Sequence, residues 1–306
     1  FATSPMVRNS DGASVSAGHG QFLLANTRGF AGGYPYSRHA LSCSPIAQRG
    51  REMQRDFWYS ADPRPDRLAD AATLGRYAAE RALARLGARR LRTGRVPVLF
   101  ESPLAIGLVG HLVQALSGGA LYRRSSFLLD SVGERIFPSH IDLVEDPTLR
   151  GEPGSAPFDS EGVRTAKRRV VEAGVIQGYF LSTYSARKLG LRTTGNAGGS
   201  HNLRLRSRRT KPTDDLDAML RRLGTGLFVT DLMGQGVNYV TGDYSRGAAG
   251  YWVENGVIAY PVEEITIAGN LREMFANIVA IGADEIRRGA KRSGSILIES
   301  MAVAGT

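Results

Sequence analysis

The chain has 306 residues, enough to build one large domain or two domains of ordinary size. Hydrophobic residues make up 42% and charged residues 22%, a composition that excludes a disordered chain and is typical of a globular protein. Lysine and arginine number 39 against 29 acidic residues, and this net charge of +10 leaves a polyanionic partner open. The single cysteine, Cys43, excludes an internal disulfide and favours a reducing compartment. Because residues 1–20 show no secretory signal pattern, we expect a cytoplasmic protein.

The N-terminal third predicts a sheet followed by a helix. Aromatic and apolar positions broken by glycine and asparagine turns indicate strands within 13–26, 28–48 and 53–61, which favours an antiparallel sheet. Residues 66–87 repeat apolar side chains at spacings of three and four, and Gly87 is placed to end that helix. The basic segment 87–97, bounded by glycine and proline, is the best candidate for a domain boundary.

The longest apolar stretch, residues 99–119, contains a single histidine, His111. A membrane span needs about 20 apolar residues, but this stretch also holds Gln114 and several glycines, so we expect a helix inside a soluble protein. Ser102 followed by Pro103 predicts the helix start, with Ser102 as the cap. The helix should run to about Ser117.

The C-terminal half mixes strands and helices without strict alternation. Two strands are predicted around residues 172–174, and a hairpin over 251–262 has Asn255 and Gly256 in its turn. A capped helix is expected over 213–224, starting at Thr213. A second helix is expected over 270–282, and its predicted inner face is Leu271, Met274, Phe275, Ile278 and Val279. This pattern predicts an α+β fold with mixed or antiparallel sheets and packed helices.

The sequence contains no recognisable local catalytic motif. A phosphate-binding glycine loop, a dinucleotide fingerprint and a nucleophile elbow are all missing from the sequence. A zinc-peptidase helix needs a second histidine about one turn from the first and an adjacent glutamate, but Leu112 follows His111 and no partner lies nearby. The other four histidines, His19, His39, His140 and His201, are isolated in sequence. A site assembled from distant residues stays open.

Arginines are most concentrated in the basic run 204–211, which could pair with phosphates. No aromatic residue is interleaved with them, and no nucleic-acid-binding signature accompanies them. We therefore favour a solvated arginine-rich loop and expect no nucleic-acid partner.

Several long phrases, taken in chain order, resemble one family, the TldD/PmbA family, and within it the PmbA/TldE branch. They lie at 9–14, 110–136, 158–165, 184–202, 232–256 and 264–271. The resemblance covers essentially the whole chain. It implies that residues 1–92 are the C-terminal part of a middle domain and residues 93–306 a complete C-terminal domain, without the N-terminal domain that family members also have.

The resemblance implies a cytoplasmic peptidase complex of two related subunits that cleaves unfolded peptides or trims modified-peptide precursors. TldD-like chains carry a His-Glu-x-x-x-His helix and a later cysteine that together hold zinc. If the first histidine is matched to His111, leucines stand at 112 and 116, and the C-terminal phrase offers Ser293 and Ser295 but no cysteine. The resemblance therefore implies a degenerate position at His111, no metal in this chain, and zinc in a TldD-like partner.

Three functional hypotheses follow. The first is a non-catalytic subunit that completes a heterodimer with a TldD-like chain and part of its peptide cleft. The phrases 195–202 and 242–250 are candidates for the cleft wall, through His201, Tyr244 and Arg246, because their glycines permit close backbone approach. The second is a homodimeric peptidase with a dispersed site of its own. The third is a basic regulatory or nucleic-acid-binding protein, whose binding would weaken steeply with salt.

Overall fold

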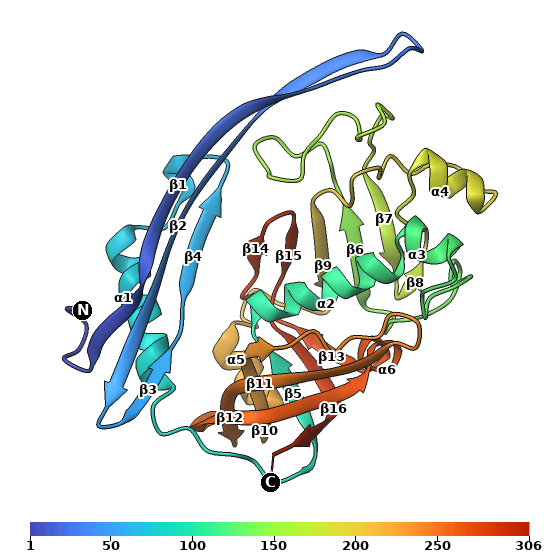
Figure 1. Cartoon of the computed structure of the whole chain (residues 1–306). Helices are drawn as coiled ribbons and strands as arrows, with labels where there is room; N and C mark the ends of the chain where they lie inside the picture. Colours follow the sequence, from blue (N-terminus) through green and yellow to red (C-terminus); the bar gives the residue numbers. More distant parts are fainter. Residues whose placement is uncertain (306) are drawn as a thin grey trace. The chain divides into compact units, whose positions relative to one another are not determined.

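The computed structural model describes residues 1–305 and divides into two compact units. The N-terminal unit is Phe1–Ala88 together with Gly151–Pro153, and the C-terminal unit comprises Arg89–Arg150 and the chain from Gly154 onward. The division after Ala88 falls four residues before the domain boundary expected after Arg92. Each unit has its own sheets and helices (Figure 1).

The N-terminal unit is built on a long antiparallel hairpin. Strands β1 (Val7–Ala25) and β2 (Ala31–Arg49) pair along their whole length, and β3 (Glu52–Arg55) and β4 (Trp58–Asp62) add to β2. A short 3-10 turn, Pro65–Arg67, precedes helix α1 (Ala71–Ala84). The Asp70 carboxylate caps α1 by accepting the Thr73 amide hydrogen at 2.8 Å. The buried face of α1 consists of Leu74, Ala78, Ala79 and Ala82.

The C-terminal unit contains two six-stranded sheets. The first has the order β12-β11-β10-β5-β16-β13. Its strands are β5 (Gly94–Phe100), β10 (Gly226–Met233), β11 (Asp243–Glu254), β12 (Val257–Asn270), β13 (Ile278–Ile281) and β16 (Ile296–Ala304). All its pairs are antiparallel except β5 with β10. The sheet is therefore mixed.

The second sheet has the order β14-β15-β9-β6-β7-β8. Its strands are β6 (Ile141–Glu145), β7 (Arg168–Glu172), β8 (Val175–Ile176), β9 (Leu203–Ser207), β14 (Ile286–Arg288) and β15 (Lys291–Ser293). Strand β9 alternates buried Leu203, Leu205 and Ser207 with exposed arginines. One face of this strand therefore belongs to the core and the other presents the basic run.

Five helices complete the C-terminal unit. They are α2 (Ser102–Ala115), α3 (Gly118–Tyr122), α4 (Thr183–Lys188), α5 (Leu216–Leu223) and α6 (Leu271–Ala276). Helix α2 runs between the two sheets (Figure 1), where Leu108 and Leu112 share a core cluster with Leu205 of β9 and Ile296 of β16. Burying each such side chain contributes about 2 kcal/mol. Burial of α2 between two sheets explains why its sequence is apolar over most of its circumference.

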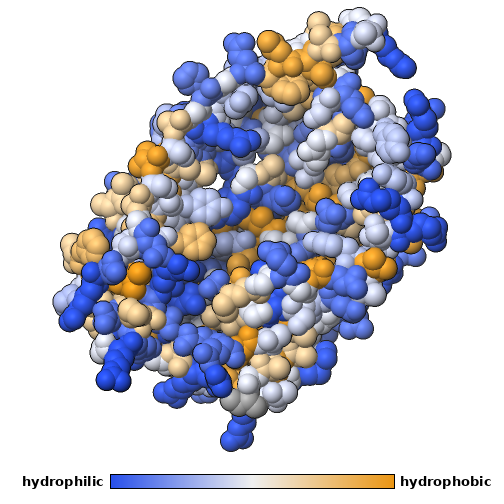
Figure 2. Space-filling model, in the orientation of Figure 1, coloured by the Kyte–Doolittle hydropathy of each residue, from blue (hydrophilic) through white to orange (hydrophobic). Residues whose placement is uncertain are grey.

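The predicted α+β class is confirmed, and several local predictions are confirmed with it. Strands β7 and β8 flank residues 173–174, and β11 and β12 form the predicted hairpin. Asn255 and Gly256 both have positive φ values, 52° and 79°, which a two-residue turn of this kind requires. The structure contains no helix, within residues 1–305, that is long and apolar enough to cross a membrane. Hydrophilic and apolar residues are interspersed over the face drawn in Figure 2.

Three helix predictions were wrong in detail. Helix α5 is capped by Asp215, whose carboxylate accepts the Ala218 amide hydrogen at 2.9 Å, and not by Thr213. Ser102 is the first residue of α2 and does not cap it, because its hydroxyl donates to Asp284 instead. The helix predicted over 270–282 ends at Ala276, and Ile278–Ile281 form strand β13, which pairs with β16. Val279 accordingly is 44% exposed instead of facing the core.

Candidate functional site

Helix α2 presents one less-buried face. Leu104, Gly107, His111 and Gln114 recur at spacings of three and four residues and are all partly or fully exposed. The remaining positions of the helix are mostly buried, including Leu112, which is 1% exposed. His111 therefore lies on the less-buried side of α2, where it is partly buried against Tyr244 of the core cluster.

His111 belongs to a cluster with two tyrosines and an arginine. Its Nδ1 atom lies 2.8 Å from the hydroxyl oxygen of Tyr239, in the loop between β10 and β11. The Tyr244 ring, on β11, meets the imidazole edge to face, with centroids 5.9 Å apart. Arg246, two residues further along the same strand face, donates from a terminal nitrogen to the Leu232 carbonyl at 3.4 Å. We call these four side chains the His111 cluster.

The charge balance of the His111 cluster keeps the imidazole neutral. Burial and, to a lesser extent, the positive charge of Arg246 together lower the pKa of His111 to about 4. Burial also raises the pKa of Tyr244 to about 12, although Arg246 opposes that rise. The cluster at neutral pH therefore contains one neutral imidazole, two neutral phenols and one fixed positive charge.

These residues do not fit a zinc ion. Zinc in proteins takes histidine, cysteine and carboxylate ligands, three or four at a time, and the His111 cluster offers one imidazole. The Arg246 guanidinium close to that imidazole would repel a divalent cation. Across residues 1–305 we find no grouping of three or more histidine, cysteine, aspartate or glutamate side chains that could hold a metal.

The leucines that stand at the glutamate and second-histidine positions of the zinc motif are buried in the core. Leu112 and Leu116 are 1% and 0% exposed and lie in the same apolar cluster as Leu108. Ser295 donates its hydroxyl to Asp284 at 2.9 Å, and Asp284 also accepts from Ser102 at the start of α2. Nine residues separate Ser102 from His111, about 13 Å along a helix axis. Ser295 is therefore linked to the start of α2, at the other end of the helix from His111, and Ser293 donates its hydroxyl to the Gly294 carbonyl.

His201 lies in a different polar network. Its ring nitrogens lie 2.9 Å from the Gly195 carbonyl oxygen and 3.3 Å from that of Gly154. Its backbone amide donates to Glu145, a carboxylate that also accepts from Asn196 and Arg168 and has a side chain 1% exposed. No hydrogen bond or ring contact within residues 1–305 joins His201 to Tyr244 or Arg246. The structure thus brings together only the last two of the three predicted cleft residues.

Sequence reasoning missed Tyr239 altogether. It lies in a glycine-containing loop without periodicity, and its partner His111 is 128 positions away in the chain. The only signal that could have singled it out is its place inside the phrase 232–256, whose resemblance to the family gives no role to individual residues.

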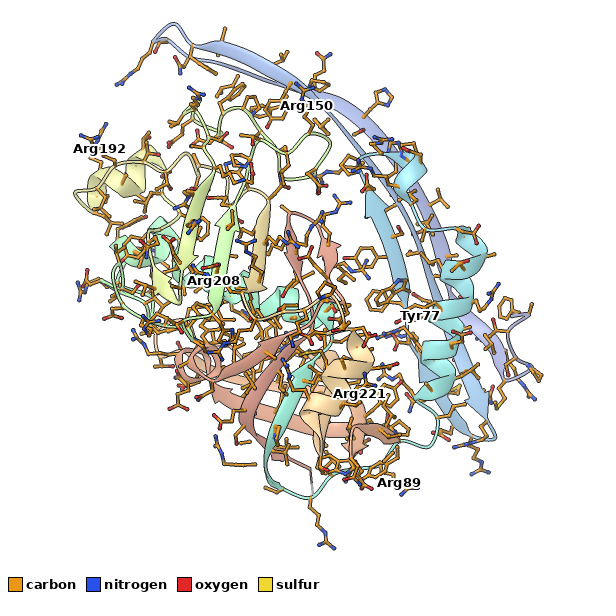
Figure 3. All side chains as sticks on the ribbon, turned by 180° about the vertical axis from the view of Figure 1, so that it is seen from behind. Tyr77, Arg89, Arg150, Arg192, Arg208 and Arg221 are labelled. Atoms are coloured by element: carbon orange, nitrogen blue, oxygen red, sulfur yellow. The ribbon has the colours of Figure 1, made fainter. Side chains whose placement is uncertain are left out.

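The basic run 204–211 is partly neutralised within the chain. Arg204 pairs with Glu285, and Arg208 (Figure 3) donates to Asp142 through Nε and one terminal nitrogen, at 2.7 and 2.8 Å. These ion pairs reduce the charge that a nucleic acid could meet. The predicted loop is wrong in part, because residues 204–207 belong to strand β9 and a turn follows them.

Two family models together match nearly the whole chain. Residues 2–86 match the PmbA/TldA metallopeptidase central domain, and residues 93–305 match the PmbA/TldA metallopeptidase C-terminal domain. The chain belongs to the PmbA/TldD family. The resemblance stated from the sequence is therefore confirmed.

Curated relatives and solved structures agree. Metalloprotease PmbA of Escherichia coli O157:H7 is 46% identical over 98% of this chain, and its Haemophilus influenzae homologue is 46% identical over 97%. The chain spans only 66% and 65% of their respective lengths. A Thermotoga maritima structure described as a candidate modulator of DNA gyrase has a TM-score of 0.90 at 29% identity, covering 99% of this chain and 71% of its own. TldE from Thermococcus kodakarensis shares the fold, with a TM-score of 0.83 at 20% identity over 96% of this chain and 69% of its own.

Proposed function

We propose that the chain is the PmbA/TldE-like subunit of a cytoplasmic TldD/TldE-type zinc metallopeptidase complex, and that it performs no hydrolysis itself. The complex would act on unfolded peptides or modified-peptide precursors. Membership of a metallopeptidase family supports the peptidase part of the proposal. The observation that carries the non-catalytic part is the His111 cluster, in which the only imidazole on α2 lies beside the Arg246 guanidinium.

The assignment of catalysis to the partner subunit rests on the residue types of helix α2. Peptide hydrolysis by zinc needs a metal-bound water and a carboxylate that takes its proton. On α2 the residue after His111 is Leu112, so neither a metal nor that carboxylate is available from this helix. A TldD-like subunit would supply both, and this chain would complete the assembly as its partner in a heterodimer.

The chain could still contribute one wall of the peptide cleft. Of the three predicted cleft residues, Tyr244 and His201 are only 1% and 9% exposed, whereas Arg246 is partly exposed. An arginine with several donors can bind the main-chain carbonyls of an extended peptide irrespective of its sequence. Arg246, which donates one hydrogen bond to the Leu232 carbonyl, is therefore the residue through which we expect the His111 cluster to meet a substrate.

Reconstitution tests this proposal. The full-length protein is assayed for hydrolysis of an unfolded peptide alone, with a TldD-like partner, and as the His111→Ala variant with that partner. We expect cleavage only in the mixture, and we expect His111→Ala to leave it unchanged. Cleavage by the chain alone, abolished by His111→Ala, would instead establish the homodimeric peptidase with its own site.

A further inference from the structure

A second polar site lies on the C-terminal unit, away from the contacts of the His111 cluster. It is a cavity of about 300 Å³ between the end of β9, the following turn and the segment before β14. Its lining includes three cationic side chains, Arg204, Arg206 and Lys211, and one anionic side chain, Glu285. We call it the β9 pocket.

Hydrogen bonds fix the walls of the β9 pocket. The Thr210 hydroxyl donates to the Ile281 carbonyl at 2.7 Å, which joins the turn after β9 to the end of β13. The Ala283 amide donates to the Asp214 carbonyl at 2.6 Å, and the Asp214 carboxylate accepts the Lys211 amide hydrogen at 2.8 Å. The pocket is thus held open before a ligand arrives, which lowers the entropic cost of binding.

The charges of the β9 pocket do not cancel. Glu285 accepts from Arg204 at 2.7 Å and also lies 3.6 Å from Arg292, so its charge is already shared between two arginines. The Asp214 carboxylate accepts the Lys211 backbone amide hydrogen, and the Asp142 carboxylate accepts two hydrogen bonds from Arg208. Within residues 1–305 the side chains of Arg206 and Lys211 make no hydrogen bond or close ion pair, and both are exposed. Arg206 lies opposite Asp142 across the β6–β9 pair and interacts with that carboxylate only through its charge. Arg206 and Lys211 therefore keep their side-chain hydrogen-bond donors available to a ligand, and the lining holds three cationic residues against one acidic residue.

The size and lining of the pocket limit the class of ligand. A volume of 300 Å³ holds one or two acidic side chains but not a nucleic-acid strand, and no aromatic residue lines it on which a base could stack. We propose that the β9 pocket binds the carboxylates of an acidic peptide segment, through Arg206 and Lys211. The choice of a peptide rests on the proposed function, and the pocket would give the complex a preference for acidic substrates.

Binding of labelled peptides to the full-length protein tests the proposal. The probes are a short peptide of alternating glutamate and glycine and its glutamine counterpart, followed by fluorescence anisotropy. The variant Arg206→Ala/Lys211→Ala removes both free charges. The control, Arg187→Ala/Arg222→Ala, removes two exposed arginines from α4 and α5.

We expect the glutamate peptide to bind at least about tenfold more tightly than the glutamine peptide, because ionic hydrogen bonds replace neutral ones. The Arg206→Ala/Lys211→Ala variant should lose that difference and the control should keep it. Equal binding of both peptides, or equal loss in both variants, would overturn the proposal. Binding of inorganic phosphate without binding of the glutamate peptide would also overturn it, and would identify a phosphate site. Cleavage of a neutral peptide by the reconstituted complex, measured in parallel, reports separately on the proposed function.

Discussion

The Nδ1 atom of His111 lies 2.8 Å from the hydroxyl of Tyr239, and this contact joins helix α2 to the loop that follows β10. A zinc-ligating imidazole would direct one nitrogen to the metal and the other to an orienting carboxylate or carbonyl. Here one nitrogen is committed to a phenol, and the nearby charge is the Arg246 guanidinium. The imidazole therefore serves the packing of α2 against β11 and its preceding loop.

The first prediction concerns the titration of His111. Because burial and Arg246 lower its pKa to about 4, the ring stays neutral through the ordinary histidine range. Its contribution to the free energy of unfolding is fully present above pH 6.5 and is lost as the pH falls from about 6.5 toward 4. NMR of labelled histidine should show the His111 ring still neutral at about pH 5. A ring that is charged at pH 6 would contradict the assignment.

The second prediction isolates Arg246. Replacing it with methionine removes the positive charge and keeps an unbranched side chain. The pKa of His111 should rise but stay below 6.5, because the imidazole remains buried, and the pKa of Tyr244 should rise further. The same NMR titration measures the first change. Arg222→Met, on the exposed side of α5, serves as the matched control and should shift neither group. An unchanged pKa of His111 would mean that burial alone lowers it.

The third prediction tests whether the zinc motif can be restored. Leu112→Glu/Leu116→His recreates the missing residue types, but both positions are buried among apolar side chains. We expect the double variant to lose roughly 3 kcal/mol or more of unfolding free energy without binding zinc, because a buried carboxylate lacks partners. Gln114→Glu, exposed on the same helix, should change stability by less than about 0.5 kcal/mol. Denaturant unfolding and metal analysis give both readouts.

The fourth prediction concerns the basic run. The Asp142 side chain is 3% exposed and accepts two hydrogen bonds from Arg208. Burial tends to raise the pKa of Asp142, but the bonds from Arg208 and the Ala173 amide outweigh it and lower that pKa. Arg208→Ala should therefore lower the free energy of unfolding near neutral pH, since it leaves a buried carboxylate short of donors.

The stabilisation that Asp142 provides is present above its ordinary pKa of 3.8 and is lost as the pH falls through its lower folded value. The cost of Arg208→Ala should accordingly shrink below about pH 4. Arg206→Ala, two residues earlier on strand β9 and without a hydrogen bond to Asp142, should stay within about 0.5 kcal/mol of the unchanged protein. Similar losses of unfolding free energy in both variants would show that the total positive charge matters, and not the Arg208–Asp142 ion pair.

Local chemistry explains which parts of the fold the sequence predicts. The Asn255-Gly256 turn needs two residues with positive φ, and these are the residue types that adopt it readily. The end of α6 could not be foreseen in the same way. Residues 278–281 have helix-like apolar spacing but pair with β16, a strand that begins 15 positions later, so tertiary pairing overrides the local pattern.

In the candidate site, too, features set by neighbouring residues were predictable and features set by distant contacts were not. The absence of a chelating partner for His111 is visible from residues 106–116 alone. The cluster around His111 joins α2 to residues more than 120 positions later, and no spacing rule reaches that far. Likewise, the hydroxyl of Ser102 is drawn to Asp284, 182 positions away, instead of capping its own helix. Contacts of this range depend on how the two sheets enclose α2.

The metal content of the isolated full-length chain tests the central claim most directly. After incubation with excess zinc and removal of free metal, the account predicts well under one zinc per chain by elemental analysis, with no change caused by His111→Ala. A TldD-like subunit treated identically should retain about one zinc per chain. One zinc per chain in this protein, lost in His111→Ala, would contradict the account and place a metal site on α2.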